Sequence, residues 1–108
     1  MIITTTTSIE GAQITEYIRL VSANIVIGTN FFSDFAASFT DFFGGRSSTY
    51  QRKLDDVYAA AIKEVEEKAA RIGADAVVGL KMDFNEISGK GKTMFMVSAV
   101  GTAVKISR

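Results

Sequence analysis

The chain has no cysteine and no histidine among its 108 residues. Without cysteine there is no disulfide, no thiol nucleophile and no thiolate metal site. Without histidine it also lacks the commonest general base and the commonest ligand of transition metals. No serine stands in an identifiable nucleophile–base pair. These absences leave no catalytic constellation, so we do not expect an enzyme.

Net charge and long apolar runs are also absent. Twelve basic residues balance twelve acidic ones, so bulk charge does not indicate a nucleic-acid or anionic-membrane partner. No apolar run reaches the ~20 residues that a membrane-spanning helix needs. The start, residues 1–7, has neither a basic leader nor an apolar core, as a signal peptide would. We therefore expect one cytoplasmic domain spanning residues 1–108.

The clearest local signal is a long amphipathic helix over Ser48–Ile72. Ser48 and Gln51 have the spacing of a capping box at its start. Gly73 follows the last apolar residue, where a left-handed C-cap favours a residue without a Cβ. The apolar stripe at spacings of three and four consists of Leu54, Tyr58, Ala61, Ile62, Val65, Ala69 and Ile72.

The other segments predict an α+β fold with a mainly antiparallel sheet, one long helix and one short Phe-rich helix. A loop with two glycines, residues 87–92, joins the last two strands. The expected strands are Ile2–Thr6, Ile14–Ile27, Ala76–Glu86 and Thr93–Ile106, and the short helix is Phe31–Phe43.

Two strands are apolar on both faces, which favours a homo-oligomer over a monomer with an exposed apolar sheet. The alternative is a strongly curled sheet that buries its second face internally. In the last strand, Met94, Met96, Val100, Val104 and Ile106 form one face, and Phe95, Val97, Ala99 and Ala103 form the other. In Ile14–Ile27, strict alternation places Tyr17, Val21, Ile25 and Ile27 opposite Ile18, Leu20 and Val26.

The Phe-rich segment is a candidate oligomer interface. Its rings exceed one helical stripe, because Phe32 and Phe43 point away from the row that contains Phe35 and Phe39. A short helix packed on its own sheet, or a platform for ligand stacking, would explain the same residues.

The turn before the long helix is a candidate anion site. Two glycines and a basic residue precede a helix N-terminus, where free N–H groups and the helix dipole attract negative charge. A purely structural turn is the alternative, since glycine is often chosen for backbone freedom. The residues concerned are Gly44, Gly45, Arg46, Ser47 and Tyr50.

Several motifs together resemble the YbjQ family of small bacterial proteins, also known as UPF0145, from about Thr4 to Lys105. They are Gly28-Thr29-Asn30, Asp34, Asp41, Gly44–Ser47, Tyr50, Leu54, Gly73–Gly79, Asp83, Met96–Ser98 and Gly101–Val104. The resemblance implies a dodecin-like subunit fold, a homopentamer with propeller-like symmetry that can stack further into a decamer, and a heavy-metal-binding role.

The residues do not favour a soft metal, because zinc and copper prefer thiolate and imidazole ligands. Met94 and Met96 share a strand face and could hold monovalent copper, although a core role is the alternative. Carboxylates brought together at subunit junctions would suit a hard cation; these are Asp34, Asp41 and Asp83. Two departures from the family pattern, Gln51 and Asn85, each replace a glutamate that could bind metal.

Three functions are compatible with this sequence. The first is an oligomeric metal-binding module that uses carboxylates or main-chain oxygens at subunit junctions. The second is an anion or metabolite carrier with pockets between subunits near Gly45, Arg46 and Tyr50. The third is a scaffold for another protein, without a small ligand.

Overall fold

A computed structural model describes residues 1–27, 47–89 and 92–108 of the chain; residues 28–46 and 90–91 lie outside the described part. The described elements are β1 (Ile2–Ile3), β2 (Gln13–Ile27), α2 (Ser47–Arg71), β3 (Ala76–Gly89) and β4 (Lys92–Ser107). The α+β class and the long helix are confirmed. The predicted helix Phe31–Phe43 lies outside the described residues.

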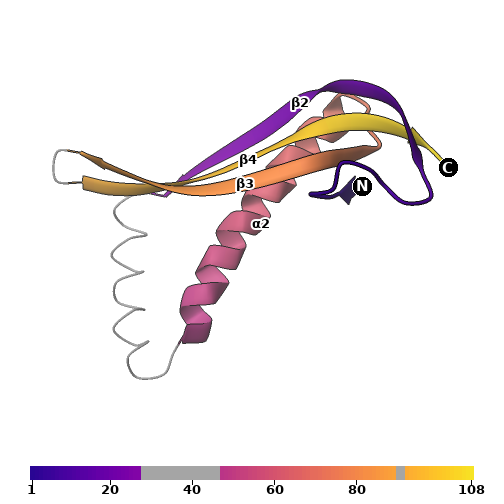
Figure 1. Ribbon diagram of the computed structural model, residues 1–108. Helices are drawn as coiled ribbons and strands as arrows, with labels where there is room; N and C mark the ends of the chain where they lie inside the picture. The colour runs from indigo at the N-terminus through magenta and orange to yellow at the C-terminus, as the bar shows by residue number, and fades with distance from the viewer. Residues whose placement is uncertain (28–46, 90–91) are drawn as a thin grey trace.

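The strands form a mixed sheet in the order β1-β3-β4-β2. β4 is central and pairs antiparallel with both β2 and β3, whereas β1 pairs parallel with β3. Figure 1 shows the three long strands side by side and α2 crossing one face of the sheet. The sheet is therefore antiparallel along its long strands and parallel only at the short β1.

The predicted loop between the last two strands was too long. Ile87, Ser88 and Gly89 pair with Met94, Thr93 and Lys92, so the strands continue to residues 89 and 92. Pairing between strands uses backbone N–H and C=O groups. Ser88 and Gly89 can therefore belong to a strand, although serine and glycine are typical of turns.

The predicted first strand was also too long, because regular pairing ends at Ile3. The chain nevertheless stays on β3: the Thr4 amide donates to the Val77 carbonyl at 2.9 Å, and the Gly79 amide donates to the Thr6 carbonyl at 2.8 Å. Gly79 has a φ of 63°, and the β3–β4 register shifts between Val78 and Lys81. This bulge in β3 interrupts the regular ladder with β1.

The predicted helix stop at Gly73 is confirmed, since Gly73 has a φ of 78°. The Ala74 amide donates to the Ala69 carbonyl at 3.0 Å, and the Gly73 amide donates to the Ala70 carbonyl at 3.1 Å. This pair of bonds is a Schellman motif, which satisfies carbonyls that the helix end leaves free. The helix begins at Ser47, one residue before the predicted start, and the capping box at Ser48 stays a prediction because only the backbone of this turn is described.

The main core lies between α2 and the sheet. Ala61, Val65 and Ala69 of the predicted stripe are fully buried, and Val57 joins them. Small and β-branched side chains on the helix let it pack closely on the pleated sheet. The sheet residues of this core are Val21, Ala23, Val77, Leu80, Val97, Ala99 and Ala103.

The two faces of β4 are as predicted, but strict alternation in β2 was wrong. The β2–β4 register shifts between Ile14 and Glu16 and again between Tyr17 and Arg19. Because of the second shift, Ile18 packs against the main core with Val21, whereas Tyr17 lies on the opposite face. One extra residue at a bulge moves each side chain before it to the other face.

Candidate functional site

Most of the predicted site residues lie outside the described part of the chain. The described part of the chain excludes Gly44, Gly45, Arg46, Asp34 and Asp41, as well as the four phenylalanines Phe32, Phe35, Phe39 and Phe43. Ser47 and Tyr50 lie in the first turn of α2, where only the backbone is described. The anion turn and the Phe-rich interface therefore stay predictions.

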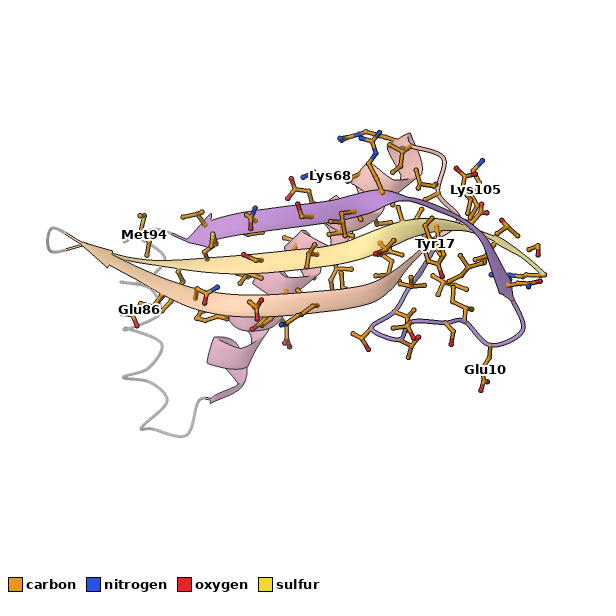
Figure 2. The ribbon with its side chains drawn as sticks, turned by 45° about the horizontal axis from the view of Figure 1, so that its top comes forward. Glu10, Tyr17, Lys68, Glu86, Met94 and Lys105 are labelled. Atoms are coloured by element: carbon orange, nitrogen blue, oxygen red, sulfur yellow. The ribbon has the colours of Figure 1, made fainter. Side chains whose placement is uncertain are left out.

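Among the described residues, the sheet face away from α2 is uncovered over much of its area and carries several exposed apolar side chains. The N-terminal residues of the chain cover one end of this face, where Ile2, Ile9 and Ile14 pack on Ala76, Val78 and Val104. Beyond that end, Leu20 is 70% exposed, Tyr17 68% and Val26 56%. In Figure 2 this face lies in front of α2, and the labels on Tyr17 and Met94 mark its two ends. We define the open face by Tyr17, Leu20, Val26, Met94 and Val100.

A polar row crosses the open face. Asp83 of β3 is paired with Ser98 of β4, which is paired with Asn24 of β2. The Ser98 hydroxyl donates to the Asn24 side-chain oxygen at 2.9 Å. Asp83 is exposed, and of the three predicted carboxylate ligands it is the one whose side chain is described. Within the described residues, no three acidic side chains come close enough to hold a metal ion.

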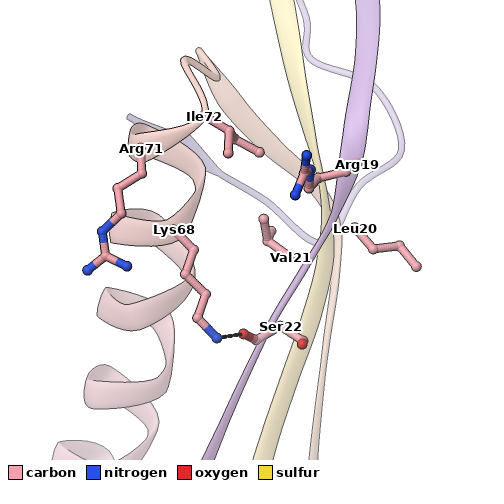
Figure 3. Close-up of a pocket in the computed structure, with 7 residues that line it drawn as sticks. All are labelled: Arg19, Leu20, Val21, Ser22, Lys68, Arg71 and Ile72. Atoms are coloured by element: carbon pink, nitrogen blue, oxygen red, sulfur yellow. Dashed lines mark hydrogen bonds between the residues drawn. The ribbon is translucent and has the colours of Figure 1, made fainter.

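On the other side of the sheet, a cleft of about 330 Å³ opens between β2 and the last turns of α2. Arg19 reaches toward it from β2, and Lys68 and Arg71 come from α2 (Figure 3). Val21 and Ile72 provide apolar lining. We call this feature the cationic cleft.

Lys68 is held in place within the cationic cleft. Its ammonium donates to the Ser22 carbonyl of β2 at 2.6 Å and lies 3.8 Å from the Glu64 carboxylate, one turn earlier. Among the described residues, no carboxylate forms an ion pair with Arg19 or Arg71. The cleft therefore contains more positive than negative charge, although the whole chain has a net charge of zero.

None of Arg19, Lys68 and Arg71 was predicted from the sequence as a site residue. Arg19 and Lys68 are far apart in the sequence and meet only because α2 packs across β2. One signal was available: two basic residues, Lys68 and Arg71, occur in the last turn of the helix.

A second hollow, of about 370 Å³, lies beside the N-terminal residues. Its two threonine hydroxyls are already paired: the Thr4 and Thr6 side-chain oxygens are 2.8 Å apart, and the Thr6 hydroxyl donates to the Ser8 carbonyl at 2.7 Å. It contains no cation, so the cationic cleft is the stronger candidate for a charged ligand.

The described part of the chain has no helix with the length and apolar character needed to cross a bilayer. Its architecture defines a small α+β protein with a helix on one face of a mixed sheet.

The chain belongs to the YbjQ family, whose model matches residues 1–107 and is described as "Putative heavy-metal-binding". It is 48% identical to a UPF0145 protein of Pasteurella multocida strain Pm70, over 98% of this chain and 99% of that protein. It is 52% identical to a UPF0145 protein of Actinobacillus pleuropneumoniae serotype 5b, with the same coverage. These relationships confirm the resemblance seen in the sequence.

The fold also resembles a solved structure. A crystal structure of a DUF74-family protein of unknown function from Pediococcus pentosaceus matches with a TM-score of 0.67 at 20% identity. The match covers 99% of this chain and 98% of the other. At this identity, the comparison supports the fold alone.

Proposed function

We propose that this protein is a homo-oligomeric binding protein in which the open face is buried against other copies of the chain. The observation that supports this is the exposure of Tyr17, Leu20 and Val26 on a regular sheet surface. Burying one such side chain is worth about 1.5–3 kcal/mol, so leaving several exposed would disfavour a free monomer. A second copy is the simplest partner, and in a ring of five copies it would cover the open face with a different surface of its own.

The proposed stoichiometry is a homopentamer, as the family resemblance implies, and pentamers that stack face to face would form a decamer. The proposal assigns the protein to the cytoplasm and gives it no catalytic role. Its ligands would bind where subunits meet, and a scaffold without a small ligand is the competing function.

The metal named in the family description has to fit the donors that the chain offers. With neither cysteine nor histidine, the chain has no thiolate or imidazole for zinc, cadmium or copper. Asp83 is exposed on the open face beside the hydrogen-bonded Ser98 and Asn24, so it offers oxygen ligands. Copies that meet through this face would bring several such oxygens together, which suits a hard cation such as calcium. We therefore propose a hard cation rather than a soft metal.

Light scattering coupled to size exclusion at low micromolar concentration tests the assembly. The expected mass is five times the 11.7 kDa of one chain, or ten times if pentamers stack. Leu20→Lys should shift the mass toward the monomer, because it places a charge in the apolar interface. Ala60→Lys, at an exposed position on α2, is the matched control and should leave the mass unchanged.

A monomeric wild-type protein would refute the assembly. If Ala60→Lys dissociates the oligomer and Leu20→Lys does not, the interface involves the outer surface of α2 instead of the open face.

A further inference from the structure

We propose that the cationic cleft binds a small phosphate-class oxyanion. All the residues that line the site belong to one subunit, and Leu20 at its edge also belongs to the open face. Arg19, Lys68 and Arg71 are its binding residues.

The cationic cleft has an excess of positive charge. Three cationic side chains line the cleft, and the one carboxylate paired with them in the described structure is Glu64, at 3.8 Å from Lys68. An anion would balance this excess, and its attraction would be strengthened by the apolar lining of Val21 and Ile72.

Lys68 and Arg19 also present hydrogen-bond donors that suit an oxyanion. An ammonium has three donors, and those of Lys68 include one that is directed to the Ser22 carbonyl at 2.6 Å. That bond fixes the ammonium against β2 and leaves donor capacity for a ligand. Arg19 offers a planar fork of donors that matches two oxygens of a phosphate. In Figure 3, Arg19 comes from β2 and Lys68 from α2, whereas the Arg71 side chain points away from β2 on the outer side of α2.

The dipole of α2 does not explain the arrangement. Cations near a helix C-terminus are stabilised by the dipole, which would account for Lys68 and Arg71. Arg19, however, belongs to β2 and follows the same face as Val21 and Ala23, which are buried in the main core. An apolar residue at this position would extend that core over Ile72. In addition, the amides of Gly73 and Ala74 already donate hydrogen bonds to carbonyls at the end of α2.

The size of the cleft limits the ligand. Small-molecule sites usually occupy about 300–1,000 Å³, and the cleft is at the lower end of that range with about 330 Å³. A phosphate, a pyrophosphate or a compact phosphomonoester fits this volume. The apolar lining would contact the organic part of a phosphomonoester.

Calorimetric titration of the full-length protein with sodium pyrophosphate, at constant ionic strength, tests the site. We expect a dissociation constant below about 1 mM, and Arg19→Gln should weaken binding at least about tenfold through loss of a bidentate charge-assisted contact. Arg19→Lys keeps the positive charge but not the planar fork of donors. Its affinity for pyrophosphate should therefore lie between that of the wild-type protein and that of Arg19→Gln. The matched control Lys63→Gln removes an exposed cation of α2 outside the cleft and should change affinity less than about twofold, because exposed charges are screened.

Arg19 is exposed, so Arg19→Gln should fold normally, and its circular dichroism and oligomer mass should match wild type. Absence of pyrophosphate binding in the wild-type protein would overturn the proposal. An equal loss of affinity in Lys63→Gln and Arg19→Gln would also overturn it, because binding would then follow total charge and not the cleft.

Discussion

Gly101 of β4 lies opposite the β3 bulge, and replacing it with alanine tests the packing there. A Cβ at residue 101 would stand 2.6 Å from Cγ1 of Val77 and 3.3 Å from the carbonyl oxygen of Val78. Carbon atoms pack best at about 3.5–4.0 Å, so the first contact is a strong overlap. Val77 is fully buried, so its methyl group cannot move aside into solvent. We expect Gly101→Ala to lower the free energy of unfolding by about 1–3 kcal/mol, the usual cost of overpacking a core.

A double-mutant cycle separates this overlap from other effects of the new methyl group. Val77→Ala removes the methyl group that the new Cβ would meet, and alone it should cost about 2 kcal/mol from lost burial plus the cavity. In that background, Gly101→Ala should cost less by about 1–2 kcal/mol, since the new Cβ then fills space that the valine has left.

Urea unfolding followed by circular dichroism gives all four stabilities. The proteins must be compared at one concentration, because subunit association would raise the apparent stability of each. Two results would refute the reasoning: a cost of Gly101→Ala below about 0.5 kcal/mol, or the same cost in both backgrounds, either of which would show that Val77 does not limit the space at Gly101.

The remaining predictions concern the helix stop and the metal. Gly73→Val should cost more than about 1 kcal/mol in urea unfolding, because a β-branched residue is strained at a φ of 78°. Gly73→Asn should cost less, since asparagine tolerates that region; equal costs would contradict a conformational origin. Calorimetry of metal-free protein should show no tight zinc binding and at most weak calcium binding that Asp83→Asn reduces. Submicromolar zinc binding that is abolished by Asp34→Asn or Asp41→Asn would restore the heavy-metal role.

The sequence predicted the elements that depend on local signals. Helix α2 was found from its apolar stripe, and its end was found from Gly73, because both depend on residues within one or two turns. The two faces of β4 were predicted from the alternation of its residues. This worked because the extra residues at the β2–β4 bulges belong to β2 and not to β4. The bulges near Ile18 and Gly79 were not found, because an inserted residue changes the pairing without an unambiguous change in composition.

The candidate site was harder to predict for a related reason. The cationic cleft combines Arg19 with Lys68 and Arg71, and this neighbourhood exists only after α2 packs on β2. In the sequence, each of these residues resembles an ordinary surface cation. The parallel pairing of β1 with β3 is equally non-local, because Ile2 and Ala76 are partners across most of the chain.

The central position of β4 has a consequence for how the chain reaches its fold. β4 follows all other described strands in the sequence, yet both β2 and β3 pair with it. During synthesis, α2 can form early, but β2 has no sheet to join until residues 92–107 have left the ribosome. The β3–β4 hairpin needs only a short loop closure, whereas β2 must close a much longer one, so we expect the hairpin to form first and β2 to dock last. Until β2 docks, the apolar face of α2 lacks part of its cover, and this interval is when the nascent chain is most exposed to aggregation or to chaperones.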